Sequence, residues 1–173
     1  RPWSGLDLDL SVSGTNGRYL DFPDAIRNPA LDPFDFNNPA VIELVAAALG
    51  IPELLPGDDL HMKDLPMFKG SIGVSYEHSL SEWGILRHWV GYRYQSRIFY
   101  NTENTLMQGG YGIFDARVAF ESLEGNWGAS IYGKNLLNRE YIQNGSDLRG
   151  TVGFATVQYG APRFLGIEYF VRY

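Results

Sequence analysis

The chain has 173 residues with a net charge of -6, and its 45% apolar and 20% charged residues are typical of a folded protein rather than a disordered one. The acidic balance argues against nucleic-acid binding, which requires a basic field, so we predict no nucleic-acid partner. The sequence contains no cysteine, which excludes a disulfide scaffold and thiolate metal sites.

Neither a transmembrane helix nor a signal peptide is visible in the sequence. No run of about 18 apolar residues occurs, although a membrane-spanning β-strand would escape that test. The first residue is Arg1, and no basic segment followed by an apolar segment is present. We therefore expect the chain to be a piece of a longer protein.

Six segments alternate between apolar and polar residues, a pattern that predicts β-strands with two different faces. In chain order they span residues 6–12, 72–80, 86–95, 112–121, 127–134 and 165–173. The pattern fits either an antiparallel sheet with one wet side or a membrane barrel with a polar lumen. Several segments approach the length of about 9 to 11 residues that crosses a bilayer, which favours the barrel.

The connections between these segments alternate between long and short: 14–69, 81–85, 98–110, 123–125 and 138–161. Outer-membrane barrels have short periplasmic turns and longer extracellular loops, so the two short connections and the C-terminus are predicted to be periplasmic. Aromatic residues near both ends predict two interfacial girdles, unless they only reflect the general preference of strands for aromatics. These residues are Trp83, Trp127, Tyr169 and Tyr173 at one end, and Phe99, Tyr100 and Tyr111 at the other.

The connection over 14–69 holds the only predicted helix. Asn38, Pro39 and Gly50 carry cap, first-turn and stop signals around an apolar run, which predicts a short helix over 39–50. Asp58, Asp59 and His61 could ligate a metal, but Pro-Gly-Asp-Asp is more typical of a solvated turn, so we predict no metal site. No nucleophile motif or phosphate-binding loop appears, so neither enzyme activity nor a cofactor is predicted.

Charges of both signs lie on the predicted polar face, which is typical of a salt-bridged lumen wall. Near the connection over 98–110, several side chains could meet a ligand, because Arg and Tyr are favoured where planar or anionic groups are held. Alternatively, these side chains form the rim of the loop, and water or lipopolysaccharide sugars satisfy their hydrogen bonds. The candidate ligand-binding residues are Arg93, Gln95, Arg97, Tyr100, Asn101 and Asn104.

Four elements near the end of the chain resemble the C-terminus of TonB-dependent outer-membrane receptors. They are Asn135-Leu136-Leu137-Asn138-Arg139-Glu140-Tyr141, the loop that follows, Gly160-Ala161-Pro162-Arg163, and the aromatic end at Tyr173. Gly5-Leu6-Asp7-Leu8 and Asp115-Ala116-Arg117-Val118 are also similar to strands of that family. The sequence departs from the family pattern at Tyr173, where Phe is usual, and at Met67-Phe68, where Ala-Pro is usual.

The resemblance implies an all-β fold, an antiparallel transmembrane β-barrel segment with one short helix in a long extracellular loop. Residues 1–173 would be the C-terminal part of the barrel domain and would supply the last six of about 22 strands, with the plug domain and earlier strands absent. It implies that Tyr173 is an assembly signal for the barrel-assembly machinery. The residues implied to face the lumen and plug are Asp115, Arg117, Lys134, Glu168 and Arg172.

The implied function is TonB-dependent transport of a scarce nutrient of the siderophore-iron, cobalamin or carbohydrate class across the outer membrane of a Gram-negative bacterium. The implied partners are outer-membrane lipid and lipopolysaccharide, a small-molecule nutrient, and the TonB-ExbB-ExbD complex through the missing N-terminal part. A passive porin-type channel and a soluble ligand-binding β-sheet protein remain alternatives. The Asn135-Leu136 and Pro162-Arg163 elements favour the receptor over both.

Overall fold

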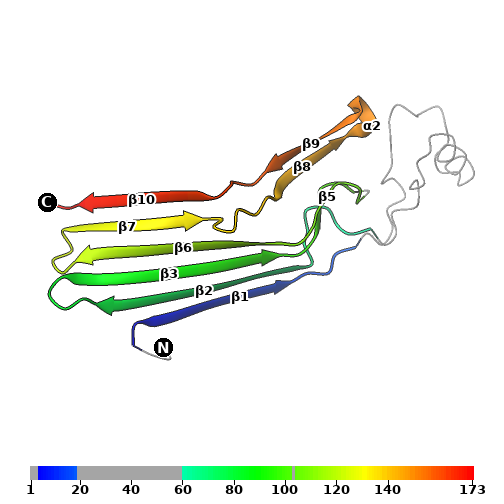
Figure 1. The fold of residues 1–173 in the computed structure, drawn as a ribbon. Coiled ribbons are helices and arrows are strands. Elements are labelled where there is room, and N and C mark those ends of the chain that lie inside the picture. Colours follow the sequence, from blue (N-terminus) through cyan, green and yellow to red (C-terminus); the bar gives the residue numbers. More distant parts are fainter. Residues whose placement is uncertain (1–3, 19–59, 103) are drawn as a thin grey trace, which may run out of the picture.

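The structure is a computed structural model that describes residues 4–18, 60–102 and 104–173, so the helix predicted over 39–50 lies outside the described residues. Its main element is a six-stranded antiparallel sheet in the order β1-β2-β3-β6-β7-β10 (Figure 1). The strands are β1 (Leu6–Gly14), β2 (Phe68–Ser79), β3 (Gly84–Gln95), β6 (Tyr111–Ser122), β7 (Trp127–Lys134) and β10 (Phe164–Val171). The predicted all-β antiparallel fold class is confirmed.

The strand register turns the alternation of the sequence into two continuous faces. The predicted apolar residues of neighbouring strands are direct partners, as in the row Leu8, Val74, Val90, Ala116, Gly133 and Leu165. The next row along the strands belongs to the opposite face and contains Asp9, Gly73, Gly91 and Asp115. Because side chains alternate strictly along a strand, one register separates the apolar face from the polar face across the whole sheet.

The two ends of the sheet differ in their connections (Figure 1). At the short-turn end, residues 80–83 and 123–126 join neighbouring strands, and the chain also terminates there. At the long-loop end, β4 (Ile98–Phe99) pairs with β5 (Met107–Gln108). A second hairpin joins β8 (Ile142–Leu148) to β9 (Phe154–Tyr159) through α2 (Arg149–Val152). This hairpin lies in the predicted loop over 138–161. Its strands were not predicted because polar residues occupy both faces of β8 and no apolar–polar alternation is visible there.

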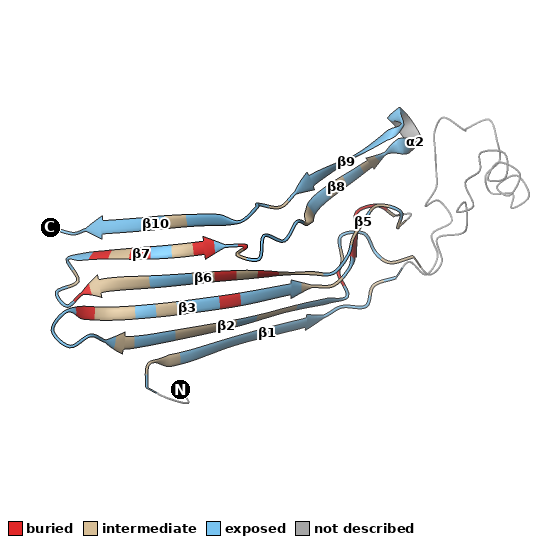
Figure 2. Ribbon diagram, in the orientation of Figure 1, coloured by how far each residue is buried: buried red, intermediate tan, exposed pale blue. Residues whose placement is uncertain are grey.

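The sheet has no core of its own. The buried apolar residues of the described part are Ile98, Phe99, Tyr100 and Ile113, and the first three belong to the connection between β3 and β6. On the apolar face, Leu10, Ile131 and Ile167 remain 72%, 61% and 77% exposed, and most of the sheet is exposed or intermediate (Figure 2). Nothing in the described chain covers this face, although burial of such side chains drives the folding of ordinary domains.

No helix among the described residues has the length and apolar character needed to cross a membrane.

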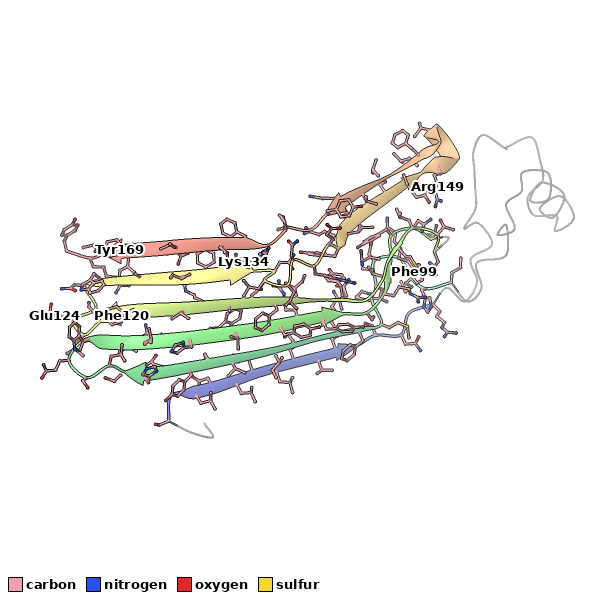
Figure 3. All side chains as sticks on the ribbon, viewed as in Figure 1. Phe99, Phe120, Glu124, Lys134, Arg149 and Tyr169 are labelled. Carbon is pink, nitrogen blue, oxygen red and sulfur yellow. The ribbon has the colours of Figure 1, made fainter. Side chains whose placement is uncertain are left out.

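Two of the four aromatic residues predicted for the short-turn end, Trp127 and Tyr169, lie close together on the apolar face with Phe120. The ring of Trp127 lies 5.2 Å from that of Phe120 and 6.5 Å from that of Tyr169, measured between centroids. Phe120 and Tyr169 are labelled in Figure 3. An interfacial girdle at this end stays a prediction. The prediction for the other end is wrong. Phe99 and Tyr100 are buried because the connection after β3 folds into its own hairpin. Tyr111 is on the polar face because it alternates with Gly112 at the start of β6 and pairs with Gln95.

Candidate functional site

A pocket with a volume of about 510 Å³ opens on the polar face at the long-loop end. Strands β1, β2, β3 and β6 supply most of its wall, because the same two-residue alternation continues to their ends. The residues that line it are Ser11, Ser13, Lys69, Gly70, Ser71, Arg93, Tyr94, Gln95, Tyr111, Ile113, Tyr141 and Gln143.

The pocket is locally cationic although the chain as a whole is acidic. Lys69 and Arg93 line it, and none of the described lining residues carries a carboxylate. Among the described residues, Arg93 forms an ion pair with Asp115, whose Oδ2 atom lies 3.2 Å from Nη2 of Arg93. The Asp115 side chain is only 12% exposed, whereas that of Arg93 is 64% exposed, so the cation is the partner that reaches the solvent.

Two tyrosines form the aromatic part of the pocket wall. The rings of Tyr111 and Tyr141 stack with their centroids 4.5 Å apart and their planes at 19°. Tyr141 also lies across Gly160, where any side chain would collide with its ring, and its carbonyl accepts a hydrogen bond of 2.8 Å from the Gly160 N–H. These contacts hold the Tyr141 ring in place beside the strand ends.

An asparagine corner, which we define as Asn135 to Asn138, connects the pocket to the start of β10. The N–H of Asn135 donates to Oδ1 of Asp115 at 2.8 Å, so the carboxylate that binds Arg93 is also bonded to the corner. The Asn135 side chain accepts from the N–H of Arg139 and donates to the carbonyls of Arg139 and Ala161. Asn135 is 3% exposed and has a left-handed φ of 49°, a conformation that Asn tolerates better than most residues.

The six predicted ligand-binding residues occupy different places. Arg93 and Gln95 line the pocket, whereas Arg97 is exposed and is not among the described lining residues. The other three hold loop segments together. The hydroxyl of Tyr100 donates to the carbonyl of Ile142 at 2.6 Å, and burial raises the pKa of Tyr100 to about 12.

Asn101 and Asn104 bond to segments that are distant in sequence. The amide of Asn101 donates to Oδ2 of Asp147 at 2.9 Å. The amide of Asn104 accepts from the N–H of His61 at 2.8 Å and donates to the carbonyl of the same residue at 2.9 Å. A contact of these residues with a ligand stays a prediction.

His61 itself stacks on Phe99, with ring centroids 5.4 Å apart. Asp58 and Asp59, the other members of the weighed metal cluster, lie outside the described residues. Within the part of the chain that the structure describes, no three His, Asp or Glu side chains come together as a metal site.

Ion pairs connect strands of the sheet on the polar face between the pocket and the short-turn end. Arg117 lies 2.6 Å from Glu168 and also donates to Ser130, and Arg172 reaches Glu121 at 3.5 Å. The five residues predicted to face the lumen and plug all lie on this polar face. They are Asp115, Arg117, Lys134, Glu168 and Arg172.

A further polar cluster attaches the β8–β9 hairpin to the connection between β3 and β6. Arg149 lies 2.5 Å from Oδ2 of Asp147 and donates to the hydroxyl of Thr105 (Figure 3). The hydrogen bond from Arg149 holds the pKa of Asp147 at about 2, below its ordinary value of 3.8.

The sequence analysis missed several pocket residues, namely Ser11, Ser13, Lys69, Ser71, Tyr111, Tyr141 and Gln143. The alternation of the second predicted strand, extended backward from residue 72, would have placed Lys69 and Ser71 on the polar face. No local sequence signal places Tyr141 in the pocket. Tyr141 lies beyond the end of β7, and it stacks on Tyr111 because the chain turns at the asparagine corner.

Comparisons with known proteins are consistent with this arrangement. The family model described as "TonB dependent receptor-like, beta-barrel" matches residues 3–136. The chain resembles the ferric yersiniabactin uptake receptor FyuA from Yersinia pestis in fold, with 21% identity, a TM-score of 0.57, and coverage of 63% of this chain and 16% of FyuA. The ferric preacinetobactin receptor BauA from Acinetobacter baumannii matches with 19% identity, a TM-score of 0.49, and coverage of 65% and 16%. A search of curated proteins found no match.

Proposed function

The chain belongs to the TonB-dependent receptor β-barrel family, and we propose that it forms the C-terminal part of the barrel of a TonB-dependent transporter in a Gram-negative outer membrane. The matched segment covers about 16% of the length of the solved receptors, so the uptake activity belongs to a longer polypeptide than the part described. The cargo would be a scarce nutrient of the siderophore-iron, cobalamin or carbohydrate class.

The observation that carries the proposal is the uncovered apolar face of the six-stranded sheet. A soluble sheet protein would cover such a face with a second layer, whereas lipid covers it in a barrel. Three of the strands, β2, β3 and β6, are 12 residues long, which exceeds the length of about 9 to 11 residues that spans a bilayer. The family match and this face together favour the receptor over the soluble alternative.

The barrel has to be completed by other strands. In the sheet, β1 and β10 each pair on one side only, and an open edge in lipid would leave backbone N–H and C=O groups without partners. In the proposed transporter, earlier strands of the same polypeptide pair with these edges and a plug domain fills the lumen. The short-turn end then lies in the periplasm, and the pocket opens toward the outside.

The first test is the intact mass of the native polypeptide that ends at Tyr173, extracted from an outer-membrane fraction. We expect a mass several times the 19.5 kDa of this chain, with a plug domain upstream. A polypeptide of about 19.5 kDa would contradict the proposal. A polypeptide that remains in the aqueous fraction without detergent would support the soluble sheet protein instead.

The second test separates the transporter from a passive porin. A strain that lacks the gene is complemented with the full-length gene, either intact or without its TonB-interacting segment, and grown with iron, cobalamin or a carbohydrate limiting in turn. We expect one nutrient to restore growth only with the intact gene. Equal growth with both versions would support passive diffusion.

A further inference from the structure

We propose that the pocket holds an oxyanion of the ligand between Lys69 and Arg93 and a planar ring of the same ligand beside the Tyr111–Tyr141 pair. The inference rests on the proposed function and narrows its cargo to an anionic compound that carries a ring. An uncharged sugar would supply no counter-charge to Lys69, which makes no ion pair among the described residues, and Arg93 would be paired with Asp115 alone.

The strand register places the two cations side by side. Lys69 pairs with Gln95, and Ser71 pairs with Arg93, so Lys69 and Arg93 are diagonal neighbours on the polar face of β2 and β3. Diagonal neighbours in an antiparallel pair lie about 7 to 8 Å apart, close enough for two long side chains to reach one carboxylate, phosphate or sulfonate group. The guanidinium supplies paired donors, and the ammonium supplies a point charge.

Asp115 orients Arg93, and Lys69 leaves the pocket with a net positive charge. Asp115 contacts Arg93 through Oδ2 and accepts a hydrogen bond from the N–H of Asn135 through Oδ1. The bond to Asn135 fixes the position of the carboxylate. The other N–H groups of the guanidinium can point toward the pocket, where hydroxyl and amide groups such as those of Ser71 and Gln95 are also available. Asp115 therefore acts as a positioning residue for the cation.

The tyrosine pair supplies the complementary apolar surface. Both rings are only partly buried, and their stacked arrangement is fixed by the contact of Tyr141 with Gly160. Stacked or edge-on contacts with a further ring add to the energy of area burial. Because the rings and the cations line one pocket, a ligand with an acidic group on or near a ring satisfies both parts at once.

The test uses the full-length receptor in lipid nanodiscs and three small probes, namely naphthoate, naphthalene methanol and cyclohexane carboxylate. Binding is measured by calorimetry against empty nanodiscs. We expect naphthoate to bind at least about tenfold more tightly than naphthalene methanol, which lacks the charge, and also more tightly than cyclohexane carboxylate, which lacks the flat ring. Its affinity should fall as the salt concentration rises.

Variants assign the effect to the pocket. Lys69→Gln and Arg93→Gln should each reduce the preference for naphthoate over naphthalene methanol, and the double variant should abolish it. Lys134→Gln is the matched control, because Lys134 also lies on the polar face but does not line the pocket, and it should keep the preference. Heat-modifiable mobility on gels verifies that each variant is folded, and Lys69→Gln alone decides the question if Arg93→Gln fails to fold.

The two proposals fail in different ways. Equal binding of naphthoate and naphthalene methanol, or no binding of either at millimolar concentration, would overturn the oxyanion site even if uptake depends on TonB. Naphthoate preference that persists in the Lys69 and Arg93 variants would overturn it as well. A native polypeptide without a plug domain would overturn the transporter instead, and the probe preference would then stand as a property of the pocket.

Discussion

Replacement of Asn135 by Ala should loosen the start of β10 and the segment that precedes the β8–β9 hairpin. The Asn135 side chain makes three hydrogen bonds, two to Arg139 and one to Ala161. At about 1 kcal/mol net for each bond, their loss costs about 3 kcal/mol. Ala at a φ of 49° adds about 1 kcal/mol of backbone strain, so the total local destabilisation is about 4 kcal/mol.

Asn138→Ala provides a matched comparison. Asn138 has nearly the same backbone conformation, with a φ of 50°, but its side chain accepts one hydrogen bond, from the N–H of Arg163 at 3.1 Å. The strain is therefore the same in both variants, and the difference between them is two hydrogen bonds, or about 2 kcal/mol. Asn135→Gly removes the strain and should recover about 1 kcal/mol relative to Asn135→Ala.

The assay is amide hydrogen exchange of the full-length receptor in lipid, read by mass spectrometry for residues 139–142 and 160–164. A local destabilisation of about 4 kcal/mol raises the opening equilibrium constant by about a thousandfold in the limit where exchange follows local opening. Peptides from the short-turn end serve as the internal reference and should exchange as in the unmodified protein. Equal protection in Asn135→Ala and Asn138→Ala would refute the reasoning from side-chain bonds.

Three other changes test the faces and the loops. Ile131→Arg on the apolar face should cost about 2 to 4 kcal/mol in a urea titration in lipid vesicles and Ile131→Ala less than half of that, whereas equal costs would exclude a lipid-facing position. Asp147 has a depressed folded pKa of about 2, so its contribution of about 2 kcal/mol is complete above its ordinary pKa of 3.8 and is lost as the pH falls toward 2. Cleavage of the β8–β9 hairpin by pepsin is therefore compared with that of Asp147→Asn at each pH, because the activity of pepsin itself changes over this interval. The unmodified protein should be cleaved more slowly than the variant at pH 3.8 and as fast as the variant when the pH approaches 2. The Arg117–Glu168 pair is about half exposed, so a double-mutant cycle in urea should give a coupling of at most about 1 kcal/mol, and a larger value would show that the pair is shielded from water.

The six long strands could be predicted from the sequence because they follow a single simple rule. One face is apolar and the other is polar, so alternation extends over the whole strand and needs no tertiary context. The errors fall at strand ends, as for β2, which starts at Phe68 rather than at residue 72. There the apolar side of the alternation includes Gly70, and the polar side includes only the small residue Ser71 and Lys69, so the pattern is weaker.

The loop hairpins and the pocket residues beyond β7, Tyr141 and Gln143, could not be predicted in this way. Strand β8 carries the sequence Ile-Gln-Asn-Gly-Ser-Asp-Leu, in which polar residues occupy both faces. Its position depends on contacts with residues that are distant in the chain, such as the bond between Tyr100 and Ile142. Arg93 and Gln95 could be predicted because they follow the alternation along β3. Tyr141 could not, because its position in the pocket depends on the backbone turn at Asn135.

The distribution of burial supports the proposal of a binding site at the long-loop end. Along the strands, the apolar face has no covering layer within the described chain, and ion pairs such as Arg117–Glu168 are spread over the polar face. At the long-loop end, by contrast, Tyr100, Asn101 and Asn135 are almost fully buried and bonded to segments far away in sequence. A pocket needs side chains that are held in fixed positions before the ligand arrives, because ordering them on binding costs affinity. The long-loop end of the described chain combines such fixed groups with the exposed cation Arg93, so we expect specificity for the ligand to be built there.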